Sequence, residues 1–369
     1  MIGAALALVY TVAASDGQSA AQPDEPVAAS APAPPAPASF TVLASGDVLV
    51  HPALTEQALA DSGTRTPDFG PLLAGVAPTV SAADLALCHL EVPLAEPGGP
   101  FAGYPNFNAP PQVATALARA GYDSCSTASN HTLDQGRDGV RRTLDALDAA
   151  GVAHTGSARS VVEAARPLIH DLGVARVAQV SFSYGYNGLE LPPDAPWLAN
   201  TLDADAVLRA ARAAKSAGAD LVIASLHWGA EYQTEPTEEQ QKIARRLLTD
   251  PAVDLIVGHH THVVQPFARI GHEWVAYGLG NHVARHSEPR GTTEEGAMAR
   301  FTFTRAPDDQ WQVTKAEYLP TLVDLGPPIR LVDLSSVPPS ARSAEALTRI
   351  DRAVRSRSAA EADLRRPGS

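Results

Sequence analysis

The sequence predicts an α/β fold that contains a second sheet, and three observations lead to this prediction. Short apolar runs alternate with amphipathic segments from residue 40 to about residue 260, which is the pattern of strands followed by helices. Polar residues with metal-binding side chains follow several of these apolar runs. Beyond residue 261 apolar and polar residues alternate, which is typical of antiparallel strands.

The individual elements follow from these patterns in chain order. The runs that predict buried strands are FTVLASGDVLV from residue 40, ADLALCHLE at 83–91, DSCSTA at 123–128, ADLVIASLHWG at 219–229 and VDLIVGHH at 253–260. The segments with helical spacing lie between them, at 112–122, 139–151, 203–218 and 237–250. The segments that predict antiparallel strands are 263–279 and 298–320.

The two ends of the chain differ in composition from this region. Residues 1–18 begin with about 14 apolar and small residues, which are typical of a secretory signal or a short membrane anchor, although basic residues are missing. Residues 19–39 are rich in Ala and Pro, which indicates a spacer or a disordered tail. We therefore expect a secreted, cell-surface or membrane-tethered protein with a domain at 40–325 and a partly helical extension at 326–369.

Composition limits the classes of partner and site. The 369 residues are 45% hydrophobic, enough for one large core or two modest ones. The net charge of −13, from 28 basic and 41 acidic residues, argues against a nucleic-acid partner. Two cysteines, Cys88 and Cys125, exclude a thiolate zinc site and allow either one disulfide or two buried thiols.

The candidate functional residues lie at or just after the carboxyl ends of predicted strands. These residues are Asp47, Glu91, Asn130, His131, His227, His260 and His262. In open parallel sheets this edge binds ligands, and these side chains suit divalent metals. A lone Asp or His at a strand end is more often a turn or cap residue, so the prediction depends on several positions coinciding.

The segment His260-Thr261-His262 gives the strongest single signal. Two imidazoles separated by one residue are placed to reach neighbouring metal ions, and the alternative is an exposed turn rich in histidine. We expect His259 to support these two without binding metal. Glu91 has two carboxylate oxygens with which to bridge two cations, and His89 is expected to face the opposite side of its strand.

Two further segments supply polar groups. The Asn130 side chain offers a neutral oxygen, and His131 is placed to protonate a leaving group or stabilise an oxyanion. Asp134 is interpreted as a cap of the following helix. His227 is a candidate ligand or a core histidine, and the aromatic residues Trp228 and Tyr232 after it would line the cleft or pack in the core.

These segments together resemble the CapA-type poly-gamma-glutamate capsule biosynthesis proteins, whose domain is similar to calcineurin-like metallophosphatases. The motifs that carry the resemblance are Gly46-Asp47, Leu90-Glu91, Ser129-Asn130-His131-Thr132-Leu133-Asp134-Gln135-Gly136, Leu226-His227-Trp228-Gly229-Ala230-Glu231-Tyr232, His260-Thr261-His262-Val263-Val264-Gln265 and Leu279-Gly280-Asn281. They lie between residues 40 and 320.

The resemblance implies a four-layer sandwich of two central mixed β-sheets flanked by helices, and a site for two divalent metal ions (Mn, Fe, Zn or Mg). It implies that Asp47 and His262 serve one metal while Glu91 bridges to the second. The ligands implied for that second metal are Asn130, His227 and His260. His131 is implied as the acid or oxyanion stabiliser.

The sequence departs from the family pattern at three places. The metallophosphatases have Asp-x-His at the first strand, whereas here the histidine is His51, which could return to the site if a helical turn followed Asp47. Glu91 stands where the broader superfamily has Asp. His282, after Asn281, stands where the family has Phe. The additional site candidates are therefore His51, Asn281 and His282.

Three functions are compatible with these residues. The first is the synthesis, export or trimming of a poly-gamma-glutamate capsule polymer through a metal-dependent hydrolase site, with membrane-bound synthesis machinery as a partner. The second is a secreted metal-dependent phosphoesterase, and the third is a module that binds the polymer without catalysis. Both hydrolase functions predict an anionic polymer or phosphoester substrate, and fold likeness alone does not separate the three.

Overall fold

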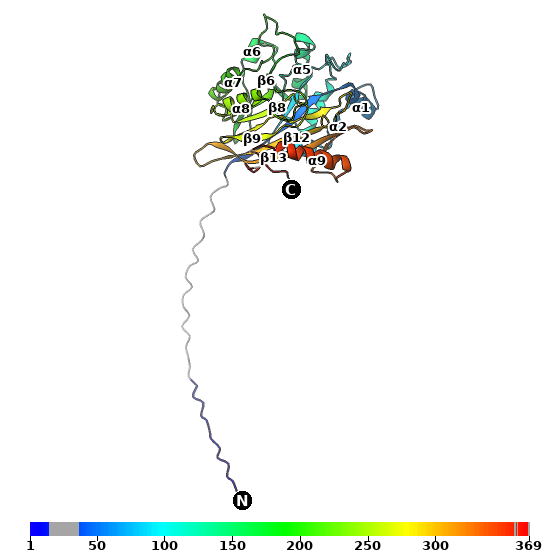
Figure 1. Ribbon diagram of the computed structural model, residues 1–369. Helices are drawn as coiled ribbons and strands as arrows, with labels where there is room; N and C mark the ends of the chain where they lie inside the picture. The colour runs from blue at the N-terminus through cyan, green and yellow to red at the C-terminus, as the bar shows by residue number, and fades with distance from the viewer. Residues whose placement is uncertain (15–36, 358, 360, 368–369) are drawn as a thin grey trace. The chain divides into compact units, whose positions relative to one another are not determined.

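The computed structural model describes residues 1–14, 37–357, 359 and 361–367. The chain divides into two units, Met1–Ala36 and Pro37–Ser369. In the first unit residues 1–14 are exposed and form no helix or strand, and residues 19–36 of the expected spacer lie outside the described residues. No helix in the described part of the chain is long and apolar enough to cross a membrane. The second unit contains the helices and strands that Figure 1 labels.

The larger sheet has eight strands in the order β14-β13-β12-β1-β2-β3-β4, and β11 also pairs with β1. Its strands are β1 (Ser39–Leu49), β2 (Leu85–Leu90), β3 (Ser124–Ser126), β4 (Ala153–Thr155), β11 (Asn281–Ala284), β12 (Glu295–Arg305), β13 (Trp311–Asp324) and β14 (Arg330–Asp333). Strand β1 is parallel to β2 and antiparallel to β12, so the sheet is mixed.

The second sheet has six strands in the order β5-β6-β7-β8-β10-β9. Its strands are β5 (Leu168–Asp171), β6 (Arg176–Ser183), β7 (Leu221–His227), β8 (Leu255–His259), β9 (Phe267–Ile270) and β10 (Glu273–Ala276). Strands β6, β7, β8 and β10 are parallel, and the outer pairings with β5 and β9 are antiparallel.

The described helices connect these strands or follow them. They are α1 (Pro52–Ser62), α2 (Gly70–Leu73), α3 (Ala77–Val80), α4 (Gln112–Ala120), α5 (Gly136–Ala150), α6 (Val161–Ala164), α7 (Ala204–Ser216), α8 (Glu238–Leu248) and α9 (Ala341–Val354). Helices α4, α5, α7, α8 and α9 are amphipathic and bury one face. Helices α8 and α9 each begin with a capping box that satisfies main-chain N–H groups.

Three hydrophobic clusters define the layers. One cluster joins α1, α4 and α5 to the outer face of the eight-stranded sheet. The second fills the space between the two sheets, and the third joins α7 and α8 to the outer face of the six-stranded sheet. The predicted four-layer α/β sandwich is therefore confirmed.

The segment after residue 325 belongs to the same compact unit. Strand β14 pairs with β13, and α9 lies beside β12 and β13 (Figure 1). The α9 residues Ala346, Ile350 and Val354 are buried in the cluster between the sheets. The expected helix near the end of the chain is present, and it completes the core of the domain.

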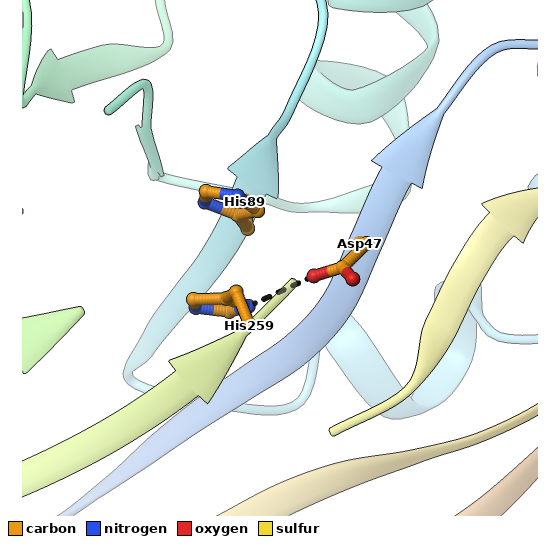
Figure 2. A group of neighbouring side chains, drawn as sticks. All are labelled: Asp47, His89 and His259. Carbon is orange, nitrogen blue, oxygen red and sulfur yellow. Dashed lines mark ion pairs between the residues drawn. The ribbon is translucent and has the colours of Figure 1, made fainter. Parts of the chain in front are cut away.

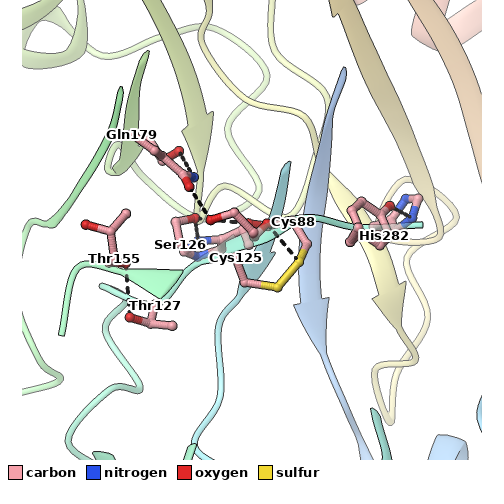
Figure 3. The surroundings of a disulfide bond; sticks show 11 residues. Cys88, Cys125, Ser126, Thr127, Thr155, Gln179 and His282 are labelled. Carbon is pink, nitrogen blue, oxygen red and sulfur yellow. Dashed lines mark hydrogen bonds between the residues drawn. A yellow bond between two sulfur atoms is a disulfide. The ribbon is translucent and has the colours of Figure 1, made fainter. Parts of the chain in front are cut away.

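Cys88 and Cys125 form a disulfide, which selects between the two states that the sequence allowed (Figure 3). They are register partners on the neighbouring parallel strands β2 and β3, with their Cα atoms 4.4 Å apart. The following residues, His89 and Ser126, are also register partners, and their side chains form a hydrogen bond of 2.8 Å. The disulfide thus holds together the two strands that position His89.

Candidate functional site

The candidate residues meet where β1, β2, β7 and β8 end. On β7 and β8 the side chains of Leu221, Ile223, Leu255 and Val257 point into the core between the sheets. Since alternate residues of a strand share a face, His227 and His259 at the strand ends face the same space. The site therefore lies between the two sheets, at the carboxyl edge that the sequence predicts.

Asp47 lies at the centre of the contacts from β8 and the turn after it. Its Oδ1 lies 3.3 Å from His259 Nδ1, its Oδ2 lies 3.2 Å from His262 Nδ1, and the main-chain N–H of His260 donates to Oδ2 at 3.2 Å. Burial alone would raise the pKa of Asp47, but hydrogen bonds and charge from His259 and His262 hold this pKa below its ordinary range. Asp47 is thus an anion in the folded protein.

A close approach of β1 to the chain near β11 fixes this position. The main-chain N–H of Asp47 donates to Gly280 O at 2.9 Å. A Cβ atom added to Gly46 would lie 2.1 Å from the same oxygen, so only glycine fits there. The register of β1 shifts between Ala44 and Asp47, which turns the carboxylate toward the six-stranded sheet.

The turn after β8 separates its two histidines. His260 and His262 have φ angles of 89° and 55°, a left-handed conformation that non-glycine residues rarely adopt. The His260 ring lies 4.6 Å from the ring of His227, whereas His262 contacts Asp47 and Asn281. Strained backbone of this kind is common at functional sites, and here it directs the two imidazoles to different neighbours.

Glu91 lies between His262 and His227 and is fully buried. Its Oε1 lies 3.7 Å from His262 Nε2 and 4.0 Å from His227 Nε2, and neither Oε1 nor Oε2 has a hydrogen-bond partner among the described residues. Burial raises the pKa of Glu91 well above its ordinary range, although the charge of His262 opposes this shift. A buried carboxyl group without donors is unfavourable unless a cation lies beside it.

His227 links Glu91 to Asn130. Its Nε2 lies 3.0 Å from Asn130 Oδ1, and its ring is completely buried. Burial, and the cost of protonating His227 beside the neighbouring His260 ring, lower the pKa of His227 well below its ordinary value, and burial lowers the pKa of His260 to about 3. Both rings are therefore neutral, which is the form that binds metal ions.

His89 faces the site, so the expectation that it points to the opposite side is wrong. Residues 89 and 91 are two apart and share one side of the chain, as alternate residues of a strand do. His89 Nε2 lies 2.9 Å from His227 Nδ1, and its ring stacks on His259 with centroids 4.1 Å apart. Figure 2 shows His89, His259 and Asp47 converging from β2, β8 and β1.

His131 is held by Asp134, and the interpretation of Asp134 as a helix cap is wrong. Helix α5 begins after Gln135, without a side-chain cap. Asp134 Oδ2 instead lies 2.7 Å from His131 Nδ1 and accepts the main-chain N–H of Phe107 at 2.7 Å. The paired carboxylate fixes the imidazole ring, which packs against the Phe107 ring.

The additional candidates have different positions. Asn281 lies in the site, where its Oδ1 is 3.0 Å from His262 Nδ1 and its Nδ2 donates to Thr293 O. His282 does not lie in the site, because consecutive residues of a strand face opposite sides. Its Nε2 lies 2.7 Å from the Tyr122 hydroxyl. The expectation that His282 lies near the site is therefore wrong.

His51 does not take the place of the missing histidine. Strand β1 continues to Leu49, so no helical turn follows Asp47 and the required return to the site does not occur. His51 Nδ1 lies 2.9 Å from Leu49 O, and the ring lines the neighbouring pocket. His262 and His259 provide the imidazoles nearest to Asp47, and His89 lies in the same group of potential ligands.

The donors fit metal ions. Two groups of three buried residues have potential ligand atoms within 4.8 Å of one another: Asp47, His89 and His259, and Glu91, His260 and His262. Besides the Glu91 oxygens, the buried His260 Nδ1 has no hydrogen-bond partner in the part of the chain that the structure describes. Carboxylates and imidazoles match manganese, iron or zinc better than calcium.

A pocket of about 570 Å³ opens beside these donors. It contains His131 and His262, together with Tyr232, Arg285 and Arg290. The arginines were not predicted as site residues, because they lie in a loop whose path cannot be deduced from periodicity. Trp228, by contrast, packs in the core, where its indole N–H donates to Tyr277 O at 2.9 Å.

A half-exposed tyrosine and an asparagine complete the other side of the site. The Tyr184 ring lies 4.6 Å from the His260 ring, and Asn187 accepts from Asn130 Nδ2 at 3.1 Å. Both follow β6 in a loop rich in Gly and Tyr. That composition is ordinary for a loop, so the sequence did not distinguish them as site residues.

A family model described as bacterial capsule synthesis protein PGA_cap matches residues 41–286. The chain belongs to this family. Capsule biosynthesis protein CapA of Bacillus anthracis is 27% identical over 199 residues, which cover 53% of this chain and 48% of that protein. PGA biosynthesis protein CapA of Bacillus subtilis is 26% identical over 198 residues, which cover 51% and 49%. The chain spans about half the length of these curated relatives.

Among solved structures, a Staphylococcus aureus protein described as a "Putative 5'-Nucleotidase" has a similar fold. Its match has a TM-score of 0.50 and 13% identity, and covers 85% of this chain and 58% of that one. At this identity the likeness concerns the fold alone. The family membership confirms the resemblance to the CapA-type proteins that the motifs predict.

Proposed function

We propose that this protein takes part in the synthesis, export or trimming of a poly-gamma-glutamate-type capsule polymer at the cell surface, through a metal-dependent hydrolase site. Family membership supports the role in capsule synthesis. The observation that carries the hydrolase activity is the buried Glu91 carboxyl group among three imidazoles, with neither oxygen hydrogen-bonded to a described residue.

Each candidate residue has a proposed role at the metal site. Asp47 and His262, with His259 beside Asp47, would hold one cation. Asn130, His227 and His260 would hold a second, and Glu91 would contact both. Bound there, the two cations would supply Lewis-acid polarisation of a substrate carbonyl or phosphoryl oxygen. His89 would support His227 by contacting its other ring nitrogen.

His131 would transfer the proton to the leaving group. Its Nδ1 is held by Asp134 at 2.7 Å, so its Nε2 is the atom left to face the substrate. The ring lines the 570 Å³ pocket, where a leaving amine or alkoxide would lie. This arrangement supplies acid catalysis for either an amide or an ester bond.

A metal-dependent phosphoesterase is the second candidate. The same observation favours it, since a histidine acid beside a carboxylate and imidazole cluster also suits the release of an alcohol from a phosphodiester. The two candidate functions therefore have to be separated by assays with different substrates.

The test uses the full chain loaded in turn with Mn²⁺, Fe²⁺, Zn²⁺ or Mg²⁺, and assays a γ-glutamyl polymer and bis-p-nitrophenyl phosphate. We expect cleavage of the polymer. Cleavage of the phosphodiester alone would identify a phosphoesterase. Polymer binding with no cleavage of either substrate would identify a non-catalytic binding module.

Metal content measured by mass spectrometry tests the site itself. His260→Ala and Glu91→Ala should each lose metal and activity, whereas His272→Ala, in the exposed turn between β9 and β10, should keep both. Unchanged metal content and activity in the first two variants would show that the site is assigned wrongly.

A further inference from the structure

Two arginines line the pocket beside the candidate site, in a chain whose net charge is −13. Arg285 and Arg290 follow β11 in the loop that leads to β12. Within the described residues, neither guanidinium group has a carboxylate oxygen within the 4.0 Å of an ion pair. Cationic side chains left without a carboxylate beside a hydrolytic centre are available to an anionic ligand.

The Arg285 side chain is held from one side. One of its terminal nitrogens donates to the main-chain oxygens of His286 and Ser287. Its main-chain N–H contacts His51 Nδ1 at 3.2 Å, which ties the loop to the start of α1. The other nitrogens of this half-buried guanidinium have no hydrogen-bond partner among the described residues, so they remain for a ligand.

The Arg290 side chain is held by an aromatic ring. Its guanidinium carbon lies 3.9 Å from the centroid of the Tyr232 ring, and such stacking leaves the N–H groups at the edge of the guanidinium plane. Tyr232 comes from the loop after β7, and the last residue of β7 is His227. The segment that follows a candidate metal ligand thus also positions Arg290.

The pocket also contains three glutamates, Glu56, Glu231 and Glu288. All three are exposed, so water and salt screen their charges. His131 and His262 lie in the same pocket, which connects the arginines to the reacting centre. A volume of about 570 Å³ exceeds the space that one carboxylate or phosphate group needs, so a larger part of a substrate fits.

We propose that Arg285 and Arg290 form an anion subsite, which binds a carboxylate or phosphate group of the substrate next to the group that is cleaved. The subsite deepens the proposed function and rests on it for the identity of the cleaved group. It selects substrates that carry repeated negative charges, because a single anionic group held at the cations would leave the arginines without a partner.

Calorimetry on the full chain after removal of metal with EDTA tests the subsite apart from catalysis. The two probes are γ-linked triglutamate, which carries carboxylates, and pyrophosphate. We expect the wild-type chain to bind one of them, and the probe that binds identifies the anion. Arg285→Gln and Arg290→Gln should each weaken that binding ~10–100-fold, the loss expected for a charge-assisted hydrogen bond.

Two matched variants control for charge and for folding. Arg209→Gln removes an exposed arginine on α7, outside the pocket, and should bind the probe as the wild type does. Arg285→Lys keeps the charge but loses the planar fork, so its affinity should be intermediate. The proposal is overturned if neither probe binds, or if both glutamine variants bind like the wild type.

Kinetics of the metal-loaded chain separate this proposal from the proposed function. If the substrate is cleaved, the glutamine variants should raise KM by a similar factor and leave kcat nearly unchanged. Cleavage with an unaltered KM would overturn the subsite while the hydrolase function stands. Probe binding that depends on the arginines, in a chain that cleaves no substrate, would support the subsite and remove the hydrolase function.

Discussion

At the scale of single residues, the contact between His131 and Asp134 fixes one orientation of an imidazole ring. Asp134→Asn keeps an acceptor oxygen for the main-chain N–H of Phe107 but loses the negative charge that stabilises a protonated His131. We expect kcat to fall about 10²–10⁴-fold, the usual contribution of a general acid, with metal content unchanged.

The leaving group provides the check on this prediction. In Asp134→Asn, steady-state rates should fall least for substrates that release p-nitrophenolate, which leaves without a proton. They should fall most for substrates that release an alkoxide or an amine. Asp138→Asn, an exposed change on the first turn of α5, serves as the control and should keep the wild-type rate. An equal loss for all leaving groups would contradict the assignment of His131 as the acid.

Glu273, at the start of β10, gives a pH dependence that is separate from the site. Burial and the charge of Asp254 raise the pKa of Glu273 from 4.5 to about 7, against the opposing charge of Lys215. The unfolded chain loses this proton first as pH rises, so the free energy of unfolding falls between about pH 4.5 and pH 7. Stability from this residue is therefore greatest at low pH.

Glu273→Gln removes that dependence. In urea denaturation we expect equal stability of variant and wild type near pH 4.5, and a variant about 1–2 kcal/mol more stable at pH 8. Glu96→Gln, at an exposed loop position, should show no such difference. Equal midpoints of Glu273→Gln and wild type at pH 8 would mean that the folded protein ionises Glu273 without cost.

At the scale of elements, strand ends made most of the site predictable. Asp47, Glu91, His227 and His260 follow apolar runs, and parallel strands bring such positions to one edge. The expectation that His89 faces away from the site is wrong, because His89 lies two residues before Glu91 and so shares its side of the chain. Alternation along β2 predicts this without a structure.

Other parts of the site depend on contacts that periodicity does not contain. The position of His259 beside Asp47 requires the two sheets to face each other in one register. Asp134 resembled a cap locally, but its partners come from the turn at His131 and the loop at Phe107. Likewise, pairing of the two cysteines depends on the register of β2 against β3, which composition does not determine.

The disulfide between β2 and β3 yields a prediction about stability. It joins residues 37 apart in sequence, Cys88 and Cys125, and a crosslink of that span restricts the unfolded chain. We expect the double variant Cys88→Ala, Cys125→Ala to lose about 3–4 kcal/mol of unfolding free energy. Urea denaturation measures this loss.

Reducing agent supplies the matched control, since it should lower the midpoint of the wild-type chain and leave the double variant unchanged. Loss of the disulfide should also loosen His89, because His89 is hydrogen-bonded to Ser126, which follows Cys125. A wild-type midpoint that does not respond to complete reduction would contradict a stabilising crosslink.

At the scale of the whole molecule, the site joins the two sheets. Asp47 and His89 lie on strands of the eight-stranded sheet, and Glu91 directly follows its strand β2. His227 and His259 lie on strands of the six-stranded sheet. Deeper between the sheets, Gln179 on β6 accepts from Ser124 Oγ at 2.7 Å and donates to Ser225 Oγ at 3.1 Å. Polar contacts thus replace apolar packing along this edge of the interface.

Metal removal should therefore change the stability of the whole domain. Glu91 is buried without a hydrogen-bond donor among the described residues, which costs free energy in the metal-free chain. A metal present at about 100 times its Kd would add about 2.7 kcal/mol to the folded state. We expect EDTA to lower Tm by about 5 °C or more.

Glu91→Gln separates the cost of burying the Glu91 carboxyl group from the stabilisation that bound metal gives. An uncharged amide costs less to bury than a carboxylate, so the metal-free variant should be at least as stable as the metal-free wild type. The variant should also lose the increase in Tm on adding metal, because its side chain no longer offers a charged bridging group. A variant that is less stable without metal, yet gains the full wild-type increase with it, would mean that Glu91 serves the packing between the sheets and not the metals.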